Sequence, residues 1–341
     1  MTRALVICIF SKSSDNTTTD VMRWLLHLGV ADVVRINADN AAEDRIVEFD
    51  VDQCSLAFRF DNRTIRLSDI DAVWYRKGRH WLCNQFLSVT FAEHPSFTSY
   101  AQKRLRTEEV RLSEYLHFLI ENTLPTLGSP GRADPNKLLV LGAAREAGLL
   151  VPLFRVTNSR AALRAALTGA PLITKPMSEG FYLFDTEESA VGYYTYTETV
   201  NSNLLDELPD RLSPCFIQEQ ILKKFDVRVF FLDGLCYAMA ILSQNDEQTR
   251  VDFRQYNRTK PNRAVPYRLP SDVTAKLGRL FERLKLNTGS VDLVVDRQDR
   301  FFFLEINPVG VFSMVSEPCN YFLEKQVALT LRQHAARNRS R

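Results

Sequence analysis

The chain has 341 residues, 45% of them hydrophobic and 25% charged, and 43 basic residues against 41 acidic ones give a formal net charge of +2. At about 150 residues per domain, this length predicts two or three domains, and the near-average composition excludes disordered, collagen-like and small disulfide-bonded proteins. The charge balance argues against a nucleic-acid-binding protein. The longest apolar run, residues 5–10, is far shorter than the roughly 18 residues of a membrane span, and no secretory h-region opens the sequence. We therefore expect a soluble, cytoplasmic protein.

Cysteine and histidine spacing shows no metal-binding or redox motif. The six cysteines are scattered without a CxxC pair, and the five histidines form no HExxH. A Walker A loop, GxGxxG and GxSxG are also absent from the sequence. The even number of cysteines permits disulfides, but free thiols are the simpler expectation.

The first 125 or so residues predict a small α/β domain. A helix with apolar spacing covers residues 17–28 and ends at Gly29, and a longer helical pattern covers about 91–122. Strands are predicted at 4–10, 32–37, 55–60, 64–67 and 72–76. A stretch rich in Pro and Gly at 124–131 then predicts a domain boundary.

The rest of the chain mixes helices with strands. The spacing predicts a helix from Asp134, as N-cap before Pro135, to Gly148, and a second helix capped by Asn158. Aromatic residues at 181–200 predict a hairpin around a polar turn. Further strands are predicted at 153–157, 172–175, 215–220, 227–232 and 235–242, with helices at 271–285 and 320–334 and a solvated, frayed basic tail at 335–341.

The most informative segment is a predicted hairpin at residues 290–307. A two-residue turn at Gln298 and Asp299 places Asp292 directly opposite Glu305, and Asn307 shares the face of Glu305. Like charges opposed across a ladder are destabilising unless a cation lies between them. Three oxygen ligands on one face therefore predict a Mg²⁺ site, and the alternative is that the acids bond nearby Arg or backbone groups.

Four basic residues are candidate anion ligands. Lys175 ends an apolar strand, and Lys137 lies in a first helical turn, where the dipole disfavours a cation unless it reaches an anion such as phosphate. Arg228 shares a strand face with Asp226, and the acid-x-Arg spacing recurs at Arg254. The alternatives are a solvated surface lysine for Lys137 and internal Asp–Arg ion pairs for the two arginines.

In this order, these segments resemble the ATP-grasp superfamily over roughly residues 115–331. The resemblance rests on Lys137, the ITKP lysine Lys175, the hinge Gln218-Glu219-Gln220-Ile221, Asp226-Val227-Arg228, Asp252-Phe253-Arg254 and the closing VDLVV…FFFLEINP segment. The sequence is also similar to the maturases of ω-ester-containing peptides (graspetides) of the grasp-with-spasm type, through residues 72–78, 262–267 and 314–321. One departure is that only residues 177–180 represent the glycine-rich loop that often follows the KP lysine.

The resemblance implies an α/β (α+β) ATP-grasp fold with an N-terminal pre-ATP-grasp α/β domain. The domains that the resemblance implies are the N-terminal domain at 1–125, a central lobe with a peptide-docking hairpin at 126–214 and a C-terminal lobe with the metal site at 215–334, followed by the basic tail at 335–341. It further implies that Lys137 and Lys175 contact ATP phosphates, that Glu219, Gln220 and Ile221 line the adenine, that Asp226 approaches the ribose, that Arg228 and Arg254 hold phosphates or an acyl phosphate, and that Asp292, Glu305 and Asn307 bind Mg²⁺.

The resemblance implies an ATP-dependent peptide macrocyclase. Such an enzyme joins Asp or Glu carboxylates to Ser or Thr hydroxyls, or Lys amines, of a ribosomally made precursor peptide with leader and core, through an acyl phosphate. A ligase that adds an amino acid to a carboxylate, and an inactive nucleotide-binding protein that docks a peptide, remain alternatives. The expected partner is the precursor peptide, with no nucleic acid and no membrane, and a homodimer is expected from the resemblance alone.

Overall fold

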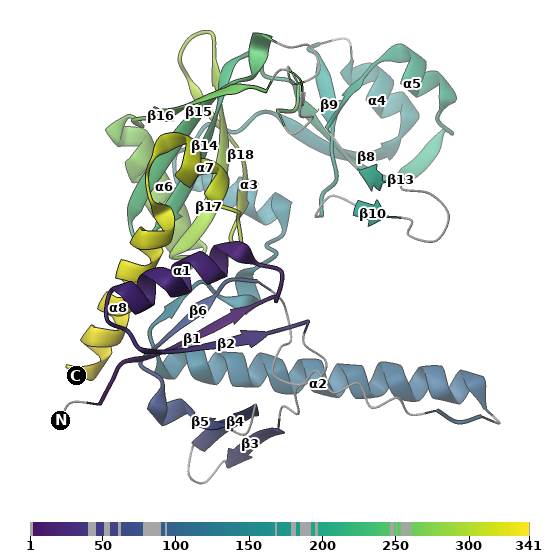
Figure 1. Cartoon of the computed structure of the whole chain (residues 1–341). Helices are drawn as coiled ribbons and strands as arrows, with labels where there is room; N and C mark the ends of the chain where they lie inside the picture. Colours follow the sequence, from purple (N-terminus) through teal and green to yellow (C-terminus); the bar gives the residue numbers. More distant parts are fainter. Residues whose placement is uncertain are drawn as a thin grey trace. The chain divides into compact units, whose positions relative to one another are not determined.

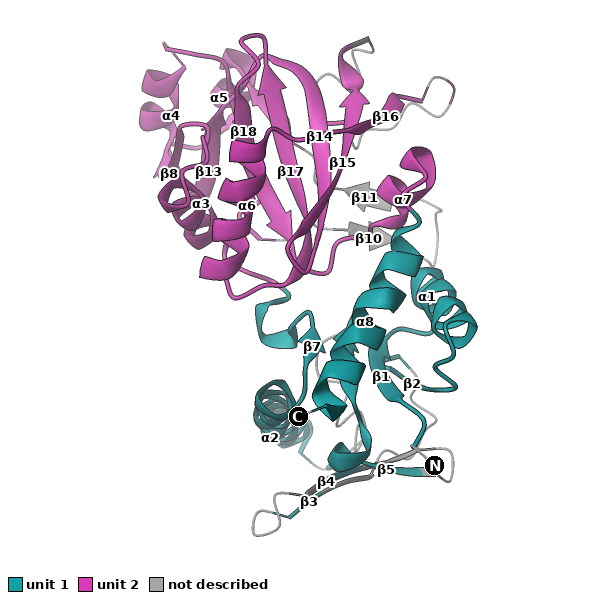
Figure 2. Cartoon of the chain, turned by 90° about the vertical axis from the view of Figure 1, so that its left-hand side faces the viewer, with its two compact units in different colours: residues 1–133, 322–341 teal, residues 134–321 magenta. Residues whose placement is uncertain are grey.

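The computed structural model describes residues 3–39, 46–50, 55–60, 63–77, 90–92, 94–167, 169–178, 182–184, 192–194, 197–245, 249, 251–253, 259 and 261–340. These residues form two compact units (Figure 2). Unit 1 contains residues 1–133 and 322–341, and unit 2 contains residues 134–321. Unit 2 therefore contains most of the segments 126–214 and 215–334, whereas residues 126–133 and 322–334 belong to unit 1. Within the described ranges, no helix has both the length and the apolar character that a membrane crossing requires.

Unit 1 is built on a parallel four-stranded sheet of order β2-β1-β6-β7. Its strands are β1 (Val6–Ser11), β2 (Asp32–Asn37), β6 (Ala72–Tyr75) and β7 (Thr126–Leu127). β1 is buried throughout, as expected for a central parallel strand that is covered on both faces. Helix α1 (Asn16–His27) ends before Gly29, whose φ of +83° suits a glycine at a helix end.

Two helices and a small sheet complete unit 1. Helix α2 (Pro95–Thr123) buries Leu116 and Ile120 against one face of the parallel sheet, together with an antiparallel sheet of β3 (Ile46–Asp50), β4 (Ser55–Phe60) and β5 (Arg63–Arg66). Helices α1 and α8 (Leu323–Arg339) lie on the opposite face (Figure 1). The sequence predicts α8 at the end of the C-terminal lobe, but the structure groups it with unit 1.

The expectation of a frayed tail at 335–341 was wrong. Helix α8 continues to Arg339, and its Ala335 is fully buried. The Arg339 guanidinium donates to both carboxylate oxygens of buried Asp71, at 2.8 and 2.7 Å. A buried carboxylate needs such a partner. The last turn of α8 is therefore anchored to Asp71 and is not a frayed end in solvent.

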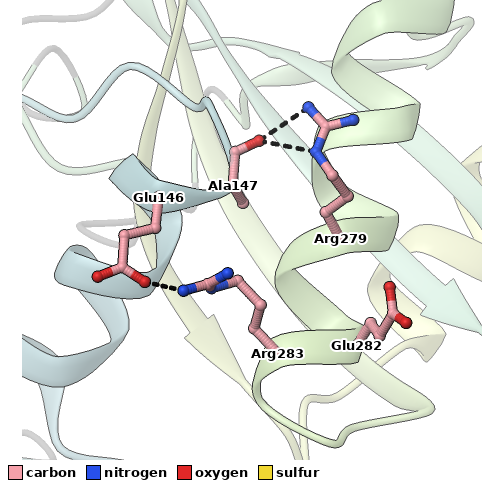
Figure 3. Close-up of a pocket in the computed structure, with 5 residues that line it drawn as sticks. All are labelled: Glu146, Ala147, Arg279, Glu282 and Arg283. Carbon is pink, nitrogen blue, oxygen red and sulfur yellow. Dashed lines mark hydrogen bonds and ion pairs between the residues drawn. The ribbon is translucent and has the colours of Figure 1, made fainter.

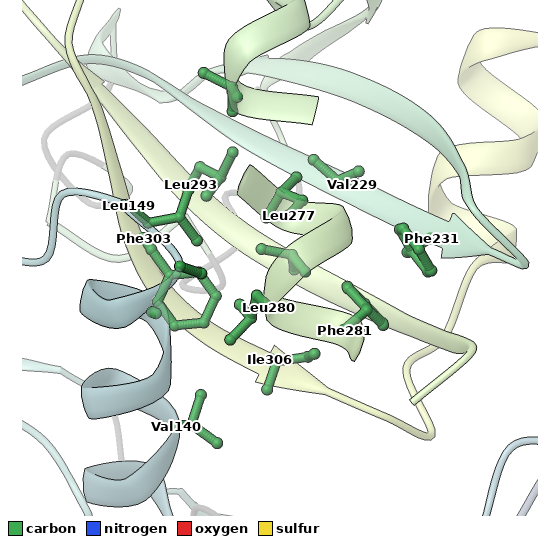
Figure 4. Close-up of a cluster of buried hydrophobic side chains, with 14 of the residues drawn as sticks. Val140, Leu149, Val229, Phe231, Leu277, Leu280, Phe281, Leu293, Phe303 and Ile306 are labelled. Atoms are coloured by element: carbon green, nitrogen blue, oxygen red, sulfur yellow. The ribbon is translucent and has the colours of Figure 1, made fainter. Parts of the chain in front are cut away.

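The larger sheet of unit 2 is antiparallel, with the order β16-β15-β14-β17-β18. Its strands are β14 (Lys223–Leu232), β15 (Leu235–Leu242), β16 (Arg263–Tyr267), β17 (Thr288–Asp296) and β18 (Phe301–Asn307). Helices α3 (Lys137–Glu146) and α6 (Ser271–Arg283) pack on one face and form the main core (Figure 4). Helix α7 (Ser313–Cys319) contacts the other face, where Phe312, just before it, packs against Phe230.

The smaller sheet of unit 2 has the order β12-β9-β13-β8. Its strands are β8 (Phe154–Ser159), β9 (Leu172–Thr174), β12 (Glu198–Val200) and β13 (Arg211–Glu219). Helices α4 (Arg160–Ala166) and α5 (Ser202–Glu207) cover one face and share a small apolar core with it. Strands β10 (Tyr182–Phe184) and β11 (Gly192–Tyr194) pair as the predicted hairpin, but β12 pairs with β9 instead of extending it.

The helix α3 is held at both ends by side chains. Asn136 Oδ1 accepts the N–H groups of Leu138 and Leu139, at 2.9 and 3.3 Å, so Asn136 is the N-cap and the prediction of Asp134 was wrong. At the other end, the Arg279 guanidinium of α6 donates twice to the carbonyl of Ala147 (Figure 3). A cation beside the last carbonyl groups of a helix also interacts favourably with the helix dipole.

Short elements account for most of the remaining differences. Ser159 rather than Asn158 caps α4, and its Oγ accepts the N–H of Ala162. The strands β3, β7 and β16 and the helices α5 and α7 were not predicted from the sequence. β16 contains Pro266, which is compatible with a strand only because β16 lies at the sheet edge.

Candidate functional site

The predicted acidic pair lies on the face of the larger sheet opposite helices α3 and α6. Val291 and Leu293 are part of the main core, so Asp292, between them, points to the other face. Asp292 lies directly opposite Glu305 in the ladder, as predicted, and Ser290 lies opposite Asn307.

The register that pairs these acids has a different origin from the one expected. Asp296 N–H donates to the Arg300 carbonyl, so the loop has three residues, 297–299, and the two-residue turn was wrong. A bulge then restores the pairing, because Asp292 faces Glu305 while Leu293 faces Phe303, leaving Leu304 as the extra residue of β18. In a regular ladder without this bulge, Leu304 would lie opposite Asp292, and Glu305 would point to the other face.

Two cations flank this acidic pair. Arg228 of β14 is the ladder neighbour of Asp292 on the other side, and its Nη1 lies 3.3 Å from Asp292 Oδ1. The Lys137 Nζ, at the start of α3, donates to the carbonyl of Pro176 at 2.6 Å and lies 3.8 Å from Glu305 Oε2. The like charges of Asp292 and Glu305 are therefore each offset by a cation from a different element.

The donor set fits a hard divalent cation. Two carboxylates and an amide oxygen on one face are ligands that Mg²⁺ accepts together with water and phosphate oxygens. The Asn307 Oδ1 accepts the Val309 N–H at 3.0 Å, which fixes its direction and leaves a second lone pair. The buried Arg228 Nε has no hydrogen-bond partner among the described residues, as expected of a group that awaits an anionic ligand. No cluster of three His, Cys, Asp or Glu side chains suited to a metal occurs in the described ranges.

Asp226 is tied to the protein rather than open on the sheet face. The Lys223 Nζ donates to Asp226 Oδ1 at 2.8 Å, and the Ser243 hydroxyl donates to Oδ2. Burial raises the pKa of Asp226, while Lys223 and Ser243 oppose the rise and Asp252 adds to it. Both carboxylate oxygens therefore already have partners.

The end of β13 lies next to the residues that directly precede β8 and β9. The N–H groups of Glu219 and Gln220 donate to the carbonyls of Leu153 and Pro171, each at 2.8 Å. Their N–H groups are thus used by the sheet, and their carbonyl oxygens are what a ligand could use. The Lys175 Nζ lies 5.9 Å from the centre of the Phe216 ring.

No protein-family model matches the sequence, and no curated protein matches it either. Solved structures do match. A RiPP-associated ATP-grasp ligase of Chryseobacterium gregarium, in complex with ADP and a leader and core peptide, has a TM-score of 0.77 and 22% identity, over 96% of this chain and 95% of that one. The macrocyclase MdnC of Microcystis aeruginosa MRC, bound with precursor peptide MdnA, has a TM-score of 0.74 and 23% identity, over 96% and 100%. The ATP-grasp ligase PsnB, complexed with minimal precursor, Mg and ADP, has a TM-score of 0.73 and 18% identity, over 98% and 99%.

The chain has the ATP-grasp fold. This confirms the fold class that the sequence predicts, and nearly the whole length of each solved structure is covered.

Within this ATP-grasp fold, the described site residues form two groups. Lys137, Arg228, Asp292, Glu305 and Asn307 come together on or beside the face of the larger sheet that is opposite α3 and α6. Glu219, Gln220 and Ile221 lie at the end of β13. Lys175 directly follows β9, which is antiparallel to β13, and therefore lies beside Phe216, further back along β13. Asp226 lies on β14 and is bonded to Lys223 and Ser243. Arg254 and residues 179–180 of the predicted loop lie outside the described residues, as does half of the 181–200 segment.

Sequence reasoning missed two residues of this region. Lys223, the partner of Asp226, is hidden from strand periodicity because Lys224 forms a bulge that brings residues 223 and 226 to one face. Gln218 belongs to the hinge segment named above, but the sequence assigns it no role; it is a buried polar residue near the end of the interior strand β13, and a polar residue within an apolar strand was the available signal.

Proposed function

We propose that this chain is an ATP-dependent macrocyclase of ribosomally made precursor peptides, a graspetide maturase. The proposal rests on Asp292 of β17 and Glu305 of β18, which lie opposite each other in the ladder. Arg228 lies beside Asp292, and Lys137 lies beside Glu305. It is supported by the fold, which this chain shares over nearly its whole length with ligases bound to precursor peptides and ADP.

The proposed nucleotide site uses the two groups of residues together. Lys137, Lys175 and Arg228, with Arg254, bind the phosphates, and Glu219, Gln220 and Ile221 line the base. Asp292, Glu305 and Asn307 hold Mg²⁺, which when bound neutralises phosphate charge. For Asp226 we propose an indirect role, because its oxygens are engaged by Lys223 and Ser243.

The chemistry proposed for this site proceeds in two steps. A side-chain carboxylate of the peptide attacks the γ-phosphorus of ATP, the bond from that phosphorus to the bridging oxygen breaks, and ADP leaves. A hydroxyl oxygen, or an amine nitrogen, of the same peptide then attacks the acyl carbon; phosphate leaves, and the proton passes to phosphate or solvent. Arg228 supplies a planar fork for the phosphoryl oxygens, and holding both reacting groups in one peptide makes the ring closure unimolecular.

The partner in this proposal is a peptide with leader and core, and the hairpin β10–β11 of the central lobe at 126–214 is the proposed docking element. The backbone pairing of Tyr182 with Tyr194 supports a hairpin there. The metal site belongs to the lobe at 215–334. A cytoplasmic location and a homodimer complete the proposal, and the four described cysteines, Cys8, Cys215, Cys236 and Cys319, are free thiols, as such a location predicts.

The test incubates the purified chain with ATP, MgCl₂ and a synthetic peptide encoded beside its gene that carries a leader and a core rich in Thr and Glu. Loss of about 18 Da per ring, the mass of one water, with one ADP released per ring supports macrocyclisation. A mass gain on adding free amino acids would instead identify an amino-acid ligase. Binding of the peptide without ADP release or mass change would show that the chain only docks it.

A further inference from the structure

The turn that follows Asn307 is packed closely against strand β17. The Gly310 N–H donates to the Asn307 carbonyl at 3.0 Å, which closes a turn over residues 307–310. Ser290, the ladder partner of Asn307, is 2% exposed. A Cβ added at Gly310 would lie 2.3 Å from the Ser290 Oγ and 2.5 Å from the Ser290 Cβ. Such distances are too short for two packed atoms, so only glycine fits at position 310 while Ser290 and the turn stay in place.

A glycine of β17 repeats this close approach one residue earlier. A Cβ added at Gly289 would lie 3.2 Å from the Asn307 carbonyl oxygen and 3.2 Å from the Pro308 Cα. Beyond the turn, the Phe312 ring is buried and packs against Phe230, with the ring centroids 4.7 Å apart. The turn therefore rests on β17 at its start and is followed by a buried aromatic anchor, so a displacement of the turn would disturb packing on both sides.

The same turn directs the amide of Asn307. The Asn307 Oδ1 accepts the Val309 N–H at 3.0 Å, so the direction of this side chain follows the backbone of the turn. Ser290 shares a face with Asp292, because side chains alternate along β17. The Ser290 hydroxyl is buried and has no hydrogen-bond partner among the described residues. Ser290 therefore contributes its small size to this arrangement, since its hydroxyl makes no bond that would hold the turn.

We propose that Gly310 is a positioning residue of the proposed metal site, because its contact with Ser290 sets the direction in which Asn307 offers its oxygen. This inference rests on the proposed function, which assigns Asn307 to Mg²⁺. A methyl group at position 310 pushes the turn away from β17 and moves the Asn307 oxygen relative to Asp292 and Glu305. Loss of a group that orients a metal ligand typically weakens metal binding about 10- to 100-fold. The residues at the end of β13 lie on another sheet, so binding of the nucleotide without metal is retained.

The test measures binding of Mn²⁺, a probe that replaces Mg²⁺, by electron paramagnetic resonance of the free ion in the presence of ADP. Gly310→Ala should weaken Mn²⁺ binding about 10- to 100-fold relative to wild type, while calorimetry without metal shows unchanged ADP binding. The matched control is Gly278→Ala on α6, where an added Cβ has no atom within 4 Å. This control should bind Mn²⁺ as wild type does.

Second-site variants separate the contact at Ser290 from a general loss of folding. Ser290→Ala and Ser290→Gly alone should keep the Mn²⁺ affinity, because neither adds an atom to the contact. Combined with Gly310→Ala, Ser290→Gly removes both contacting atoms and should restore most of the affinity, whereas Ser290→Ala leaves the Cβ at 2.5 Å and should restore less. Ser290→Cys enlarges only the contacting atom, so it should cause a smaller loss, and it tests the same contact if Gly310→Ala does not fold.

Thermal unfolding without metal is measured for each variant to identify a purely structural effect. A lowered unfolding midpoint of Gly310→Ala with unchanged Mn²⁺ affinity would overturn the inference and leave the proposed function standing. Weakened Mn²⁺ binding in Ser290→Ala would do the same, because the hydroxyl itself would then serve the metal site. Equal Mn²⁺ affinity of wild type and Asp292→Asn would instead refute the metal assignment and, with it, the proposed function.

Discussion

Asp226→Asn tests whether the Asp226 carboxylate holds the fold or meets a ligand. Its Oδ1 lies 2.8 Å from the Lys223 Nζ, and both side chains are at least nine-tenths buried. At this distance and an effective dielectric constant near 20, the attraction is about 6 kcal/mol before desolvation is counted. Since removing one partner of a buried pair leaves the other charge unpaired, we expect the variant to lose about 3–5 kcal/mol of unfolding free energy.

The assay is urea unfolding without nucleotide, followed by far-UV circular dichroism. The expected loss moves the midpoint of unit 2 by about 1–2 M urea. All three tryptophans lie within residues 1–133, so tryptophan fluorescence reports unit 1 and serves as an internal reference. The matched control is Asp299→Asn, which removes the partner of Lys224 at a pair that is more than half exposed, and it should leave the midpoint unchanged.

Two results would refute this reasoning about Asp226. One is an unchanged midpoint for Asp226→Asn together with weakened ADP binding, which would return the carboxylate to the ribose contact. The other concerns the double variant in which Lys223→Met accompanies Asp226→Leu. Replacing a buried ion pair with apolar groups is often neutral, so this variant should recover most of the lost stability. If it is as unstable as Asp226→Asn, the unpaired charge is not the cause.

Further predictions concern the metal, the phosphates, the acid range and the C-terminal helix. Glu305→Gln should lower Mg²⁺-dependent ADP release at least about 100-fold with an unchanged fold; wild-type release would contradict the metal assignment. Arg228→Lys keeps the charge but loses the planar fork, so ADP formation should fall about 100-fold in a coupled assay. Burial raises the pKa of Asp296, but hydrogen bonds from Arg300 and Gln298 outweigh it and lower this pKa below its ordinary value of 3.8. The ionised carboxylate therefore stabilises the folded state above pH 3.8, and this contribution is lost as the pH falls through the lowered pKa. Below pH 4, the urea midpoint of Asp296→Asn should therefore depend less on pH than the midpoint of wild type does. Arg339→Ala should destabilise unit 1 by about 1 kcal/mol, measured by tryptophan fluorescence.

Controls for these variants come from exposed residues of the same type. Glu282→Gln, on α6 in Figure 3, should release ADP as wild type does. Arg337→Ala, on the last turns of α8, should leave the stability of unit 1 unchanged, because the two bonds to Asp71 come from Arg339. Parallel pH profiles for wild type and Asp296→Asn would show that this carboxylate has no role in acid stability.

Much of the fold was readable from local patterns. The strand at 4–10, the helices that end at Gly29 and Gly148, and the hairpin at 290–307 follow from apolar spacing and from glycines at positive φ. Errors occurred where elements are short or where a nearby polar residue competes for the same role. Asn136 and Asp134 are both good N-caps, and only the backbone direction at residue 136 selects one.

The candidate site shows where sequence reasoning ends. The opposition of Asp292 and Glu305 was predicted correctly from a turn that is one residue too short, because the bulge at Leu304 compensates for the longer loop. The two-residue alternation of a strand cannot reveal that a longer loop and a bulge compensate for each other. It also cannot reveal the bulge at Lys224 that brings Lys223 to the face of Asp226.

The sequence by itself determined the residue types of this protein's site: two opposed carboxylates with an amide, a lysine at a helix start and an arginine on a sheet face. Only the tertiary structure decided their partners. The Lys137 Nζ bonds the Pro176 carbonyl and faces Glu305, and these groups come from three elements far apart in the chain. The physical reason is that strand and helix periods specify which face a side chain takes, whereas the packing of α3 against the larger sheet specifies what that side chain meets.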